Sequence, residues 1–339
     1  MNKPTGGSRG ILYAALILLP ALLTAGSLFI GRYRLGLGDV AGILSDGLGS
    51  AADSIPHAVV WELRVPRALL ALLVGGSLAV SGGALQGIFR NPLVDAGMLG
   101  VSSGAGFGAC LAILLFGAST AFTFVFAFAF GILAVFLSFM TSRIYRSAPT
   151  IMLVLGGIVI SSIFSSLISF TKYVADPDEQ LPSITFWLMG SLARANYKDL
   201  LPALVPIGLG VGGIFSLRWR INLLSIGDKE AQTMGVNTEA VRIVLIACTA
   251  LATAGAVCLS GTIGWIGLII PHIGRMLVGN DNRRLLPVSF SLGACFLLLV
   301  DNIGRTIASG EIPIGVLTAL LGSPFFIYLL GRVKGGSNW

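Results

Sequence analysis

Charged side chains are scarce in this chain of 339 residues. Lys, Arg, Asp and Glu make up 11% of the sequence, whereas hydrophobic residues make up 55%. A soluble domain carries about 25% charged residues, so there is too little charge here to cover a water-exposed surface. The composition predicts a polytopic membrane protein. The formal net charge of +7 is then explained by basic residues that keep loops on the cytoplasmic side, rather than by binding to nucleic acid.

Residues that carry out catalysis or hold metals are equally scarce. The only histidines are His57 and His272, and no His-Glu-x-x-His run or Ser-His-Asp set is visible. No Gly-x-x-x-x-Gly-Lys-Ser/Thr loop occurs, so the chain does not bind ATP in the P-loop manner. The sequence therefore predicts neither an enzyme nor a resident metal or cofactor. The cysteines lie singly in apolar runs, where a thiol behaves as a small hydrophobe, and they are Cys110, Cys248, Cys258 and Cys295.

What the chain does contain is a series of long apolar runs. Crossing a bilayer takes about 20 apolar residues in a helix, and the helix must satisfy its own backbone hydrogen bonds. No linker divides the chain, so we expect one transmembrane domain over 1–339, all-α, with about ten spans. The expected spans are 11–30, 64–86, 96–116, 121–142, 150–171, 200–217, 239–259, 263–278, 286–307 and 313–331.

The distribution of basic residues predicts the orientation. With the N-terminus inside, 14 of the 22 Lys and Arg residues fall on inner segments and 8 on outer ones, so we expect both termini to be cytoplasmic. The first run is long enough to be a retained helix, with a cleaved signal as the alternative. On the outer side, Ile184–Leu192 is too short to span and predicts an interfacial helix. Asp301 and Arg305 are spaced to pair on one helix face.

A polar island at 217–242 interrupts the apolar pattern. Ser225 or Gly227 can cap a short helix that begins near Asp228, and Gly235 can end it in a left-handed conformation. Thr238 can then cap the next span. A capped helix between two spans is suited to docking a soluble protein, with Ala231 and Met234 as its apolar contact face. An ordinary cytoplasmic loop is the alternative.

Two further patterns concern helix packing and the interior. Gly100, Gly104 and Gly108 repeat at a spacing that favours close contact between membrane helices. A second cluster consists of hydroxyl residues, which can either line a polar path or bond back to their own helix: Ser161, Ser162, Ser165 and Ser166.

Taken together, these motifs resemble those of the FecCD family of ABC importer permeases, whose members serve iron–siderophore, haem and vitamin B12 uptake. The resemblance is colinear from about 61 to 331. It rests on Leu63-Arg-Val-Pro-Arg67, Gln86–Leu93, Leu99-Gly-Val-Ser-Ser-Gly104, Phe186-Trp-Leu-Met-Gly190, Gly227–Gly235, Gly267-Leu-Ile-Ile-Pro-His272, Glu311-Ile-Pro-Ile-Gly315 and Leu321-Gly-Ser-Pro-Phe325.

The resemblance implies a type II ABC importer permease fold with ten helices per subunit, and two subunits around a central path. Two cytoplasmic ATPase subunits would dock on a coupling loop at about 218–238, and an outer substrate-binding protein would deliver the cargo. By position, the gate of the family maps to about Ser147 and Thr150, with Ser161, Ser162 and Ser165 along the path. The outer arginines that match docking positions are Arg64, Arg67 and Arg305. The coupling residues are Gly227, Asp228, Lys229, Glu230, Ala231, Met234 and Gly235.

The expected function is therefore that of a multi-pass permease in the cell membrane, which works by alternating access as part of an ATP-driven importer. A ferric siderophore is the expected cargo, with haem, a corrinoid and molybdate or tungstate as alternatives, and a homodimer is the expected assembly. An ion-gradient transporter and an intramembrane enzyme are the competing functions. The near absence of deep ionisable residues argues against the first of these, and the absence of a catalytic constellation argues against the second.

Overall fold

The computed structural model describes residues 6–47, 54–143, 149–308 and 310–333, and no β-strand occurs in that part of the chain. The all-α prediction is confirmed. The elements are α1 (Gly6–Ser27), α2 (Leu37–Asp46), α3 (Ile55–Ala58), the π-helix η1 (Val59–Arg64), α4 (Val65–Phe89), the 3₁₀ helix η2 (Ala96–Leu99), α5 (Val101–Phe116), α6 (Thr120–Arg143), α7 (Pro149–Val174), α8 (Gln180–Leu188), α9 (Tyr197–Ile226), α10 (Asp228–Thr233), α11 (Thr238–Ser260), α12 (Ile266–Val278), α13 (Asn282–Gly304) and α14 (Ile314–Val333).

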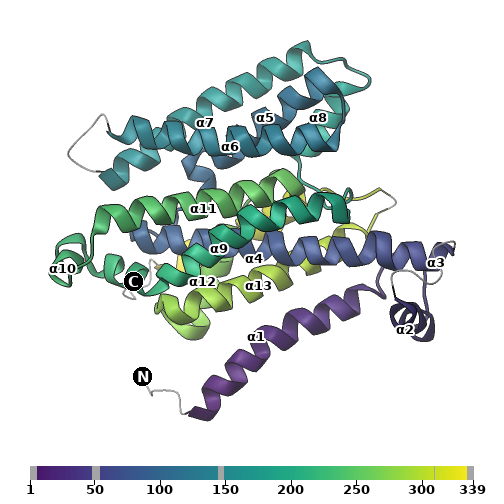
Figure 1. Cartoon of the computed structure of the whole chain (residues 1–339), viewed down its shortest axis with the longest axis horizontal. Coiled ribbons are helices and arrows are strands. Elements are labelled where there is room, and N and C mark those ends of the chain that lie inside the picture. The colour runs from purple at the N-terminus through teal and green to yellow at the C-terminus, as the bar shows by residue number, and fades with distance from the viewer. Residues whose placement is uncertain (1–5, 48–53, 144–148, 309, 334–339) are drawn as a thin grey trace.

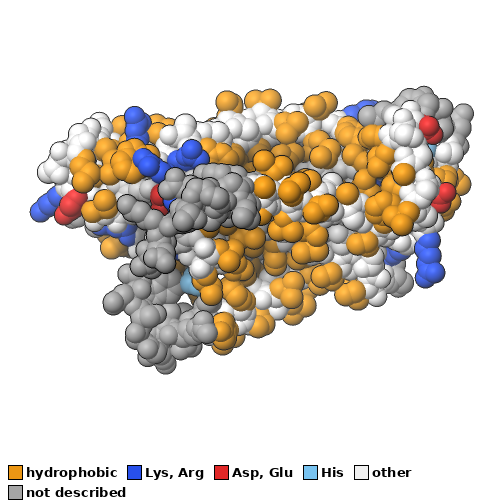
Figure 2. Space-filling view, turned by 90° about the horizontal axis from the view of Figure 1, so that it is seen from below, with side chains coloured by type: hydrophobic (Ala, Val, Ile, Leu, Met, Phe, Trp, Pro, Cys, Tyr) orange, Lys and Arg blue, Asp and Glu red, His pale blue; other side chains and the backbone are white. Residues whose placement is uncertain are grey.

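Within the described residues, ten helices have the apolar composition of membrane spans. Six are long enough to cross a bilayer, and in one of these α3, η1 and α4 continue as a single helix over Ile55–Phe89. Four more are apolar but shorter, over Ala14–Ser27, Val101–Phe116, Ile266–Val278 and Ile314–Tyr328. Figure 2 shows the same division on the surface, where hydrophobic side chains cover the middle of the molecule and charged side chains gather towards its two ends.

Helix α4 lies at the centre of the bundle and contacts α9, α11, α12 and α13 (Figure 1). Small residues allow this position, because they let backbones approach closely. A Cβ atom added at Gly75 would lie 2.2 Å from the carbonyl oxygen of Gly293 on α13. One added at Gly82 would lie 2.0 Å from the carbonyl oxygen of Gly267 on α12. At both crossings the backbones touch, with no side chain between them.

The α5–α8 region forms a separate layer beyond α11 (Figure 1). The predicted close packing of the α5 glycines is confirmed, because Cβ atoms at Gly104 and Gly108 would lie 2.4 and 2.2 Å from backbone oxygens of α6. Helix α7 packs on α5 and α6 but leaves an apolar side uncovered. Ile158, Val159 and Ile163 on that side are each more than half exposed.

Several boundaries differ from the sequence prediction. The predicted span at 200–217 continues to Ile226, because no helix breaker occurs before Gly227; Trp219 on this extension lies under the Arg283 guanidinium, 3.9 Å from ring centroid to Cζ. The interfacial helix α8 begins and ends four residues earlier than the predicted Ile184–Leu192, because Gly190, at φ 74°, lies just beyond it. The outer segment at 31–63 also contains α2, α3 and η1, which the prediction missed.

Candidate functional site

The end of the bundle that carries α10 is called the inner end here, following the predicted orientation. Gly227 separates α9 from α10 and, of the two predicted caps, is the residue at the N-cap position. Its φ of 157° is a backbone conformation that residues with a side chain rarely adopt, so the turn favours glycine. Gly235 has φ 79°, which is the left-handed conformation predicted for the residue that ends this helix.

The surface of α10 that faces away from the bundle is mostly polar. Lys229 and Glu230 are exposed, and Met234 is 58% exposed. Ala231 is only 1% exposed, because it faces inward, where its carbonyl accepts a hydrogen bond from the Val236 N–H at 3.1 Å. The predicted apolar contact face is therefore wrong for Ala231, since of the two predicted residues only Met234 is exposed.

A charged contact anchors α10 to α11. Arg242 donates from Nη2 to both carboxylate oxygens of Asp228, at 3.0 and 2.9 Å. The Arg242 side chain is 11% exposed and that of Asp228 is 39% exposed, so the guanidinium forms the buried half of the pair. Gln232 donates to Oγ1 of Thr238 at 3.3 Å. Thr238 was predicted to cap α11, and this prediction is wrong, because Asn237 occupies the N-cap position.

Open space lies beside this anchor. A cavity of about 490 Å³ separates α10 and α11 from the inner ends of α6 and α7, and Asp228 and Arg242 are among its lining residues. Across it, Arg143 on α6 pairs with Glu239 on α11 at 2.9 Å. Because α10 borders a cavity instead of a packed helix on this side, its position depends strongly on the Asp228–Arg242 contact.

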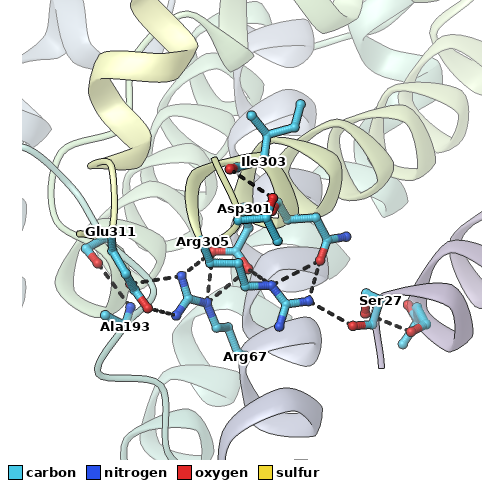
Figure 3. A network of polar contacts seen from close by, with 11 residues as sticks. Ser27, Arg67, Ala193, Asp301, Ile303, Arg305 and Glu311 are labelled. Atoms are coloured by element: carbon cyan, nitrogen blue, oxygen red, sulfur yellow. Dashed lines mark hydrogen bonds and ion pairs between the residues drawn. The ribbon is translucent and has the colours of Figure 1, made fainter. Parts of the chain in front are cut away.

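At the opposite, outer end, Arg67 lies between two carboxylates (Figure 3). It donates from Nε and Nη2 to Asp301 at 2.8–3.0 Å, and from Nη1 and Nη2 to Glu311 at 2.8 and 3.1 Å. The Asp301 side chain is 1% exposed, and a carboxylate buried this deeply requires a charged partner. The contacts join α4, α13 and the segment that leads into α14.

Arg305 lies one turn beyond Asp301, at the C-cap of α13, with its Nε 3.9 Å from the Asp301 carboxylate. This contact confirms the predicted pairing, at the limit of ion-pair distance. The stronger contacts of Arg305 are to Asn302, which accepts from Nε at 3.1 Å, and to the carbonyl of Ser27 in α1, which accepts from Nη2 at 2.8 Å (Figure 3).

Arg64 is 4% exposed and donates to the backbone carbonyls of Leu28 and Tyr33. All three arginines predicted to meet a binding protein therefore make hydrogen bonds within this chain. A docking protein would have to add to these contacts or exchange with them. Docking itself stays a prediction.

The residues predicted for the path and the gate are only partly described. Ser147 lies outside the described residues, as does the side chain of Thr150. On α7, Ser161 is partly exposed, and Ser162 and Ser165 are exposed. Their role in a path is not tested by this arrangement. The alternative of bonding back to the helix holds for Ser166, the fourth residue of the predicted cluster, because its hydroxyl donates to the carbonyl of Ser162. The hydroxyl of Ser169, one turn further on, donates to the carbonyl of Ser165 in the same way.

A cavity of about 630 Å³ with a mostly apolar lining lies where α12 begins. Helix α12 has 13 residues, or ~20 Å of length, which is less than the bilayer core of about 30 Å. The preceding segment at 261–265 is not helical, and Trp265 has φ 72°. Asp95 and Thr253 line the cavity, and the Thr253 hydroxyl has no partner in the described chain. Irregular backbone is tolerated at membrane depth where it lines such a space.

Two of these features, the anchor through Arg242 and the network around Arg67, were not predicted from the sequence. Arg242 was assigned no role, and the Arg67 network joins residues that are distant along the chain. In the described residues, no group of three or more His, Cys, Asp and Glu side chains is placed to hold a metal, and the four cysteines are free. The two polar ends and the cavity between them are thus the candidate working parts.

Comparison with known proteins places this architecture in a family. The profile of the FecCD transport family matches residues 17–332. The molybdate import system permease of Haemophilus influenzae is 44% identical over 326 residues, which are 95% of this chain and 96% of that one. A probable iron chelatin transport system permease of Helicobacter pylori is 43% identical over 277 residues, 82% of this chain and 83% of that one.

A solved structure of similar sequence has the same fold as this chain. It is described as an inward-facing conformation of a metal-chelate type ABC transporter, and it superposes with a TM-score of 0.85 at 43% identity. The match covers 96% of this chain and 99% of that one. The family profile matches most of the chain, and relatives at 43–44% identity are matched over most of their length. This chain therefore belongs to the FecCD transport family and is a multi-span cell-membrane permease of the ABC importer type.

Proposed function

We propose that this chain is the permease subunit through which an ATP-driven importer moves a metal chelate into the cytoplasm. The observation that carries the proposal is α10, a six-residue helix that is anchored to α11 through Arg242. Glu230 on this helix and Met234 at its C-cap are exposed. A short anchored helix between two spans gives a soluble protein a defined place to dock. Because the sequence has no phosphate-binding loop, we assign ATP hydrolysis to a separate chain.

The assembly we propose contains two permease subunits, two cytoplasmic ATPase subunits and an outer substrate-binding protein. The coupling surface is Gly227–Gly235, and both termini lie on the cytoplasmic side. A second copy of the same chain is the preferred partner, because this one sequence carries both the inner and the outer docking elements. The uncovered apolar side of α7 supports an assembly in which that helix faces lipid or the second subunit.

In the proposed cycle, ATP binding brings the ATPases together, and α10 passes that movement to α11. The Asp228–Arg242 contact is the physical link, because it is the ion pair between the two helices. The cargo path then opens alternately to each side of the membrane. We propose that Ser161, Ser162 and Ser165 face this path, with the gate near Ser147 and Thr150.

The cargo we propose is a ferric siderophore. The family includes iron-chelate importers, and the Helicobacter pylori relative is named for iron chelatin. The Haemophilus influenzae relative is named for molybdate, so relatives at nearly equal identity differ in cargo. Haem, a corrinoid and molybdate remain the alternatives, with the same mechanism.

The first test is co-purification of the tagged chain from its native membrane, followed by mass spectrometry. A P-loop ATPase at one copy per permease supports the proposal, and uptake by the purified complex should then require ATP. If the intact chain carries no ATPase and uptake collapses with an ionophore instead, the chain is an ion-gradient transporter.

A second test addresses the docking surface with Glu230→Lys. We expect this variant to insert normally and to lose the bound ATPase, because Glu230 is exposed and forms no ion pair in the described chain. The matched control is Glu179→Lys, the same charge reversal at an exposed position on the outer side. Asp228 is a poorer choice, because its reversal also breaks the anchor to Arg242. Equal ATPase retention in both variants would remove α10 as the docking site.

A further inference from the structure

At the inner end of the bundle, an arginine of α13 is stacked on a tryptophan of α9. The guanidinium carbon of Arg283 lies 3.9 Å from the centre of the Trp219 ring. Arg283 is exposed, and Trp219 is 49% exposed. A guanidinium that is stacked by its face keeps the N–H groups on its edge available for hydrogen bonds. In the described chain, the Arg283 side chain donates no hydrogen bond, so those donors are free.

Hydrogen bonds between α9 and α13 fix the position of this stacked pair. Asn222 donates from Nδ2 to the Asp281 carboxylate at 2.7 Å, and its Oδ1 accepts from the N–H and Nδ2 of Asn282, both at 2.8 Å. Asp281 also accepts from the backbone N–H of Arg283 at 3.0 Å and caps α13. The pair is thus built on a held junction of two helices, where Asp281 is bonded to amides instead of to a guanidinium group.

Positive charge exceeds negative charge at this junction. Arg218 and Arg220 flank Trp219 in the sequence, and both are exposed. In the described chain, no carboxylate lies within ion-pair distance of these two arginines or of Arg283. Three exposed guanidinium groups therefore accompany the Asp281 carboxylate, which leaves them available to an anion from outside the chain.

A similar contact elsewhere at the inner end has its own counter-charge. Arg143 lies over the ring of Phe139, with 4.9 Å between the guanidinium carbon and the ring centre. Its guanidinium also pairs with Glu239 at 2.9 Å. Arg283 has the same kind of aromatic support without such a carboxylate, so Arg143 is a matched control for it.

The junction lies at the depth of the inner lipid headgroups. On α9, Leu201, Val205 and Leu209 are 63–65% exposed, and their spacing places them on one side of the helix. Trp219 follows Leu201 by five full turns, so it lies on that same side. The bilayer core is about 30 Å thick, which is about 20 residues of helix. A span that begins at Leu201 therefore ends at about Arg220.

We propose that Trp219, Arg220 and Arg283 bind the headgroup of an anionic phospholipid of the inner leaflet. Guanidinium groups bind phosphate through paired hydrogen bonds. Tryptophan is enriched at headgroup depth, and basic clusters on the cytoplasmic side attract anionic lipids. The acyl chains of the same lipid lie along the exposed apolar side of α9, from Leu201 to Leu209.

A lipid suits this place better than an acidic surface of a soluble protein. Trp219 lies on the side of α9 that faces the membrane, and α9 continues for six residues beyond Arg220, about 9 Å, before α10 begins. The site is therefore apart from the proposed ATPase contact and from the cargo path, and it does not depend on the cargo. Because α9 leads into α10, a lipid bound here fixes the depth from which α10 extends towards the ATPase.

The test uses the full-length protein in phosphatidylcholine bilayers with a rising fraction of brominated phosphatidylglycerol, and brominated phosphatidylcholine is the reference. Bromine quenches a tryptophan that it contacts, and the difference between the unaltered protein and Trp219→Phe gives the signal of Trp219. We expect phosphatidylglycerol to quench Trp219 in preference to phosphatidylcholine. Arg283→Gln should weaken this preference about fivefold, and Arg143→Gln should leave it unchanged. Arg220→Gln repeats the test if Arg283→Gln does not fold.

The outcomes separate a specific lipid site from general attraction to the inner surface. A preference for phosphatidylglycerol that Arg283→Gln weakens and Arg143→Gln does not supports the site. Equal quenching of Trp219 by the two lipids in the unaltered protein overturns the proposal, and so do equal losses in Arg283→Gln and Arg143→Gln. Loss of the co-purified ATPase in Arg283→Gln, with the lipid preference unchanged, also overturns it and makes the junction a protein-docking surface.

Discussion

Removing the charge of Asp228 and removing that of Arg242 should lower the local stability of α10 by unequal amounts. The Arg242 side chain is 11% exposed and that of Asp228 is 39% exposed, and Nε of Arg242 is buried without a partner. Asp228→Asn leaves a mostly buried guanidinium without its counter-charge. Arg242→Met keeps an apolar stem in the same space and leaves a carboxylate that water can reach. We therefore expect Asp228→Asn to be the more damaging change.

The magnitude lies between two limits. Exposed ion pairs contribute about 0.2–1 kcal/mol, and removal of one partner from a fully buried pair costs about 3–5 kcal/mol. Discounting for the solvent that reaches Asp228, we expect a loss of about 2 kcal/mol for Asp228→Asn and about 1 kcal/mol or less for Arg242→Met. The loss should be local, because the pair anchors a helix of six residues.

Hydrogen–deuterium exchange of the 228–236 peptide measures this local loss, because exchange reports the free energy of local opening. A cost of about 2 kcal/mol corresponds to exchange roughly thirtyfold faster at the Ala231 and Val236 amides, which are hydrogen-bonded in the intact loop. Glu230→Gln, at an exposed position with no ion pair, is the control and should exchange at the original rate. Unchanged exchange in Asp228→Asn, or faster exchange in Arg242→Met than in Asp228→Asn, would refute the reasoning.

Two further predictions concern stability. Gly108→Ala should destabilise the protein by about 1–3 kcal/mol and so lower its thermal unfolding midpoint in detergent, because the new Cβ would lie 2.2 Å from the carbonyl oxygen of Phe126. Gly212→Ala is the control and should leave the midpoint unchanged, because a Cβ there has no atom within 4 Å. Asp301→Asn should destabilise more than Glu311→Gln, by about 3–5 against about 1 kcal/mol, because the two side chains are 1% and 33% exposed. Equal midpoints within either pair of variants would contradict the corresponding argument.

The apolar helices could be predicted from the sequence, because each depends on a local property, an apolar run, and six of these runs are long enough to cross a bilayer. The short helix α10 could also be predicted from local residues, the two glycines that bound it. Gly227 and Gly235 mark its two ends, and both have positive φ in the structure. The end of α9 within the polar island at 217–242 was harder to predict. No residue in 218–226 ends a helix, and α9 continues to Ile226.

Contacts between distant residues were beyond sequence reasoning. Arg67 meets Asp301 and Glu311, which lie 234 and 244 positions later, and no local pattern links them. The inward orientation of Ala231 depends on how α10 packs, not on which residues it contains. The break before α12 was predicted at 260–262, and in the structure it extends to Trp265, where the apolar run gives no sign of it; the left-handed backbone of Trp265 is rare for such a residue.

The backbone contacts of α4 restrict how this molecule can move. Where Gly75 meets Gly293 and Gly82 meets Gly267, no side chain lies between the helices, so no change of rotamer can absorb a displacement. Sliding one helix past another by even a fraction of a residue would drive carbonyl oxygens into Cα atoms. Near these crossings, α4, α12 and α13 must therefore translate together as one rigid unit. Any change of shape that moves a cargo has to occur at the borders of that unit, where side chains separate the helices.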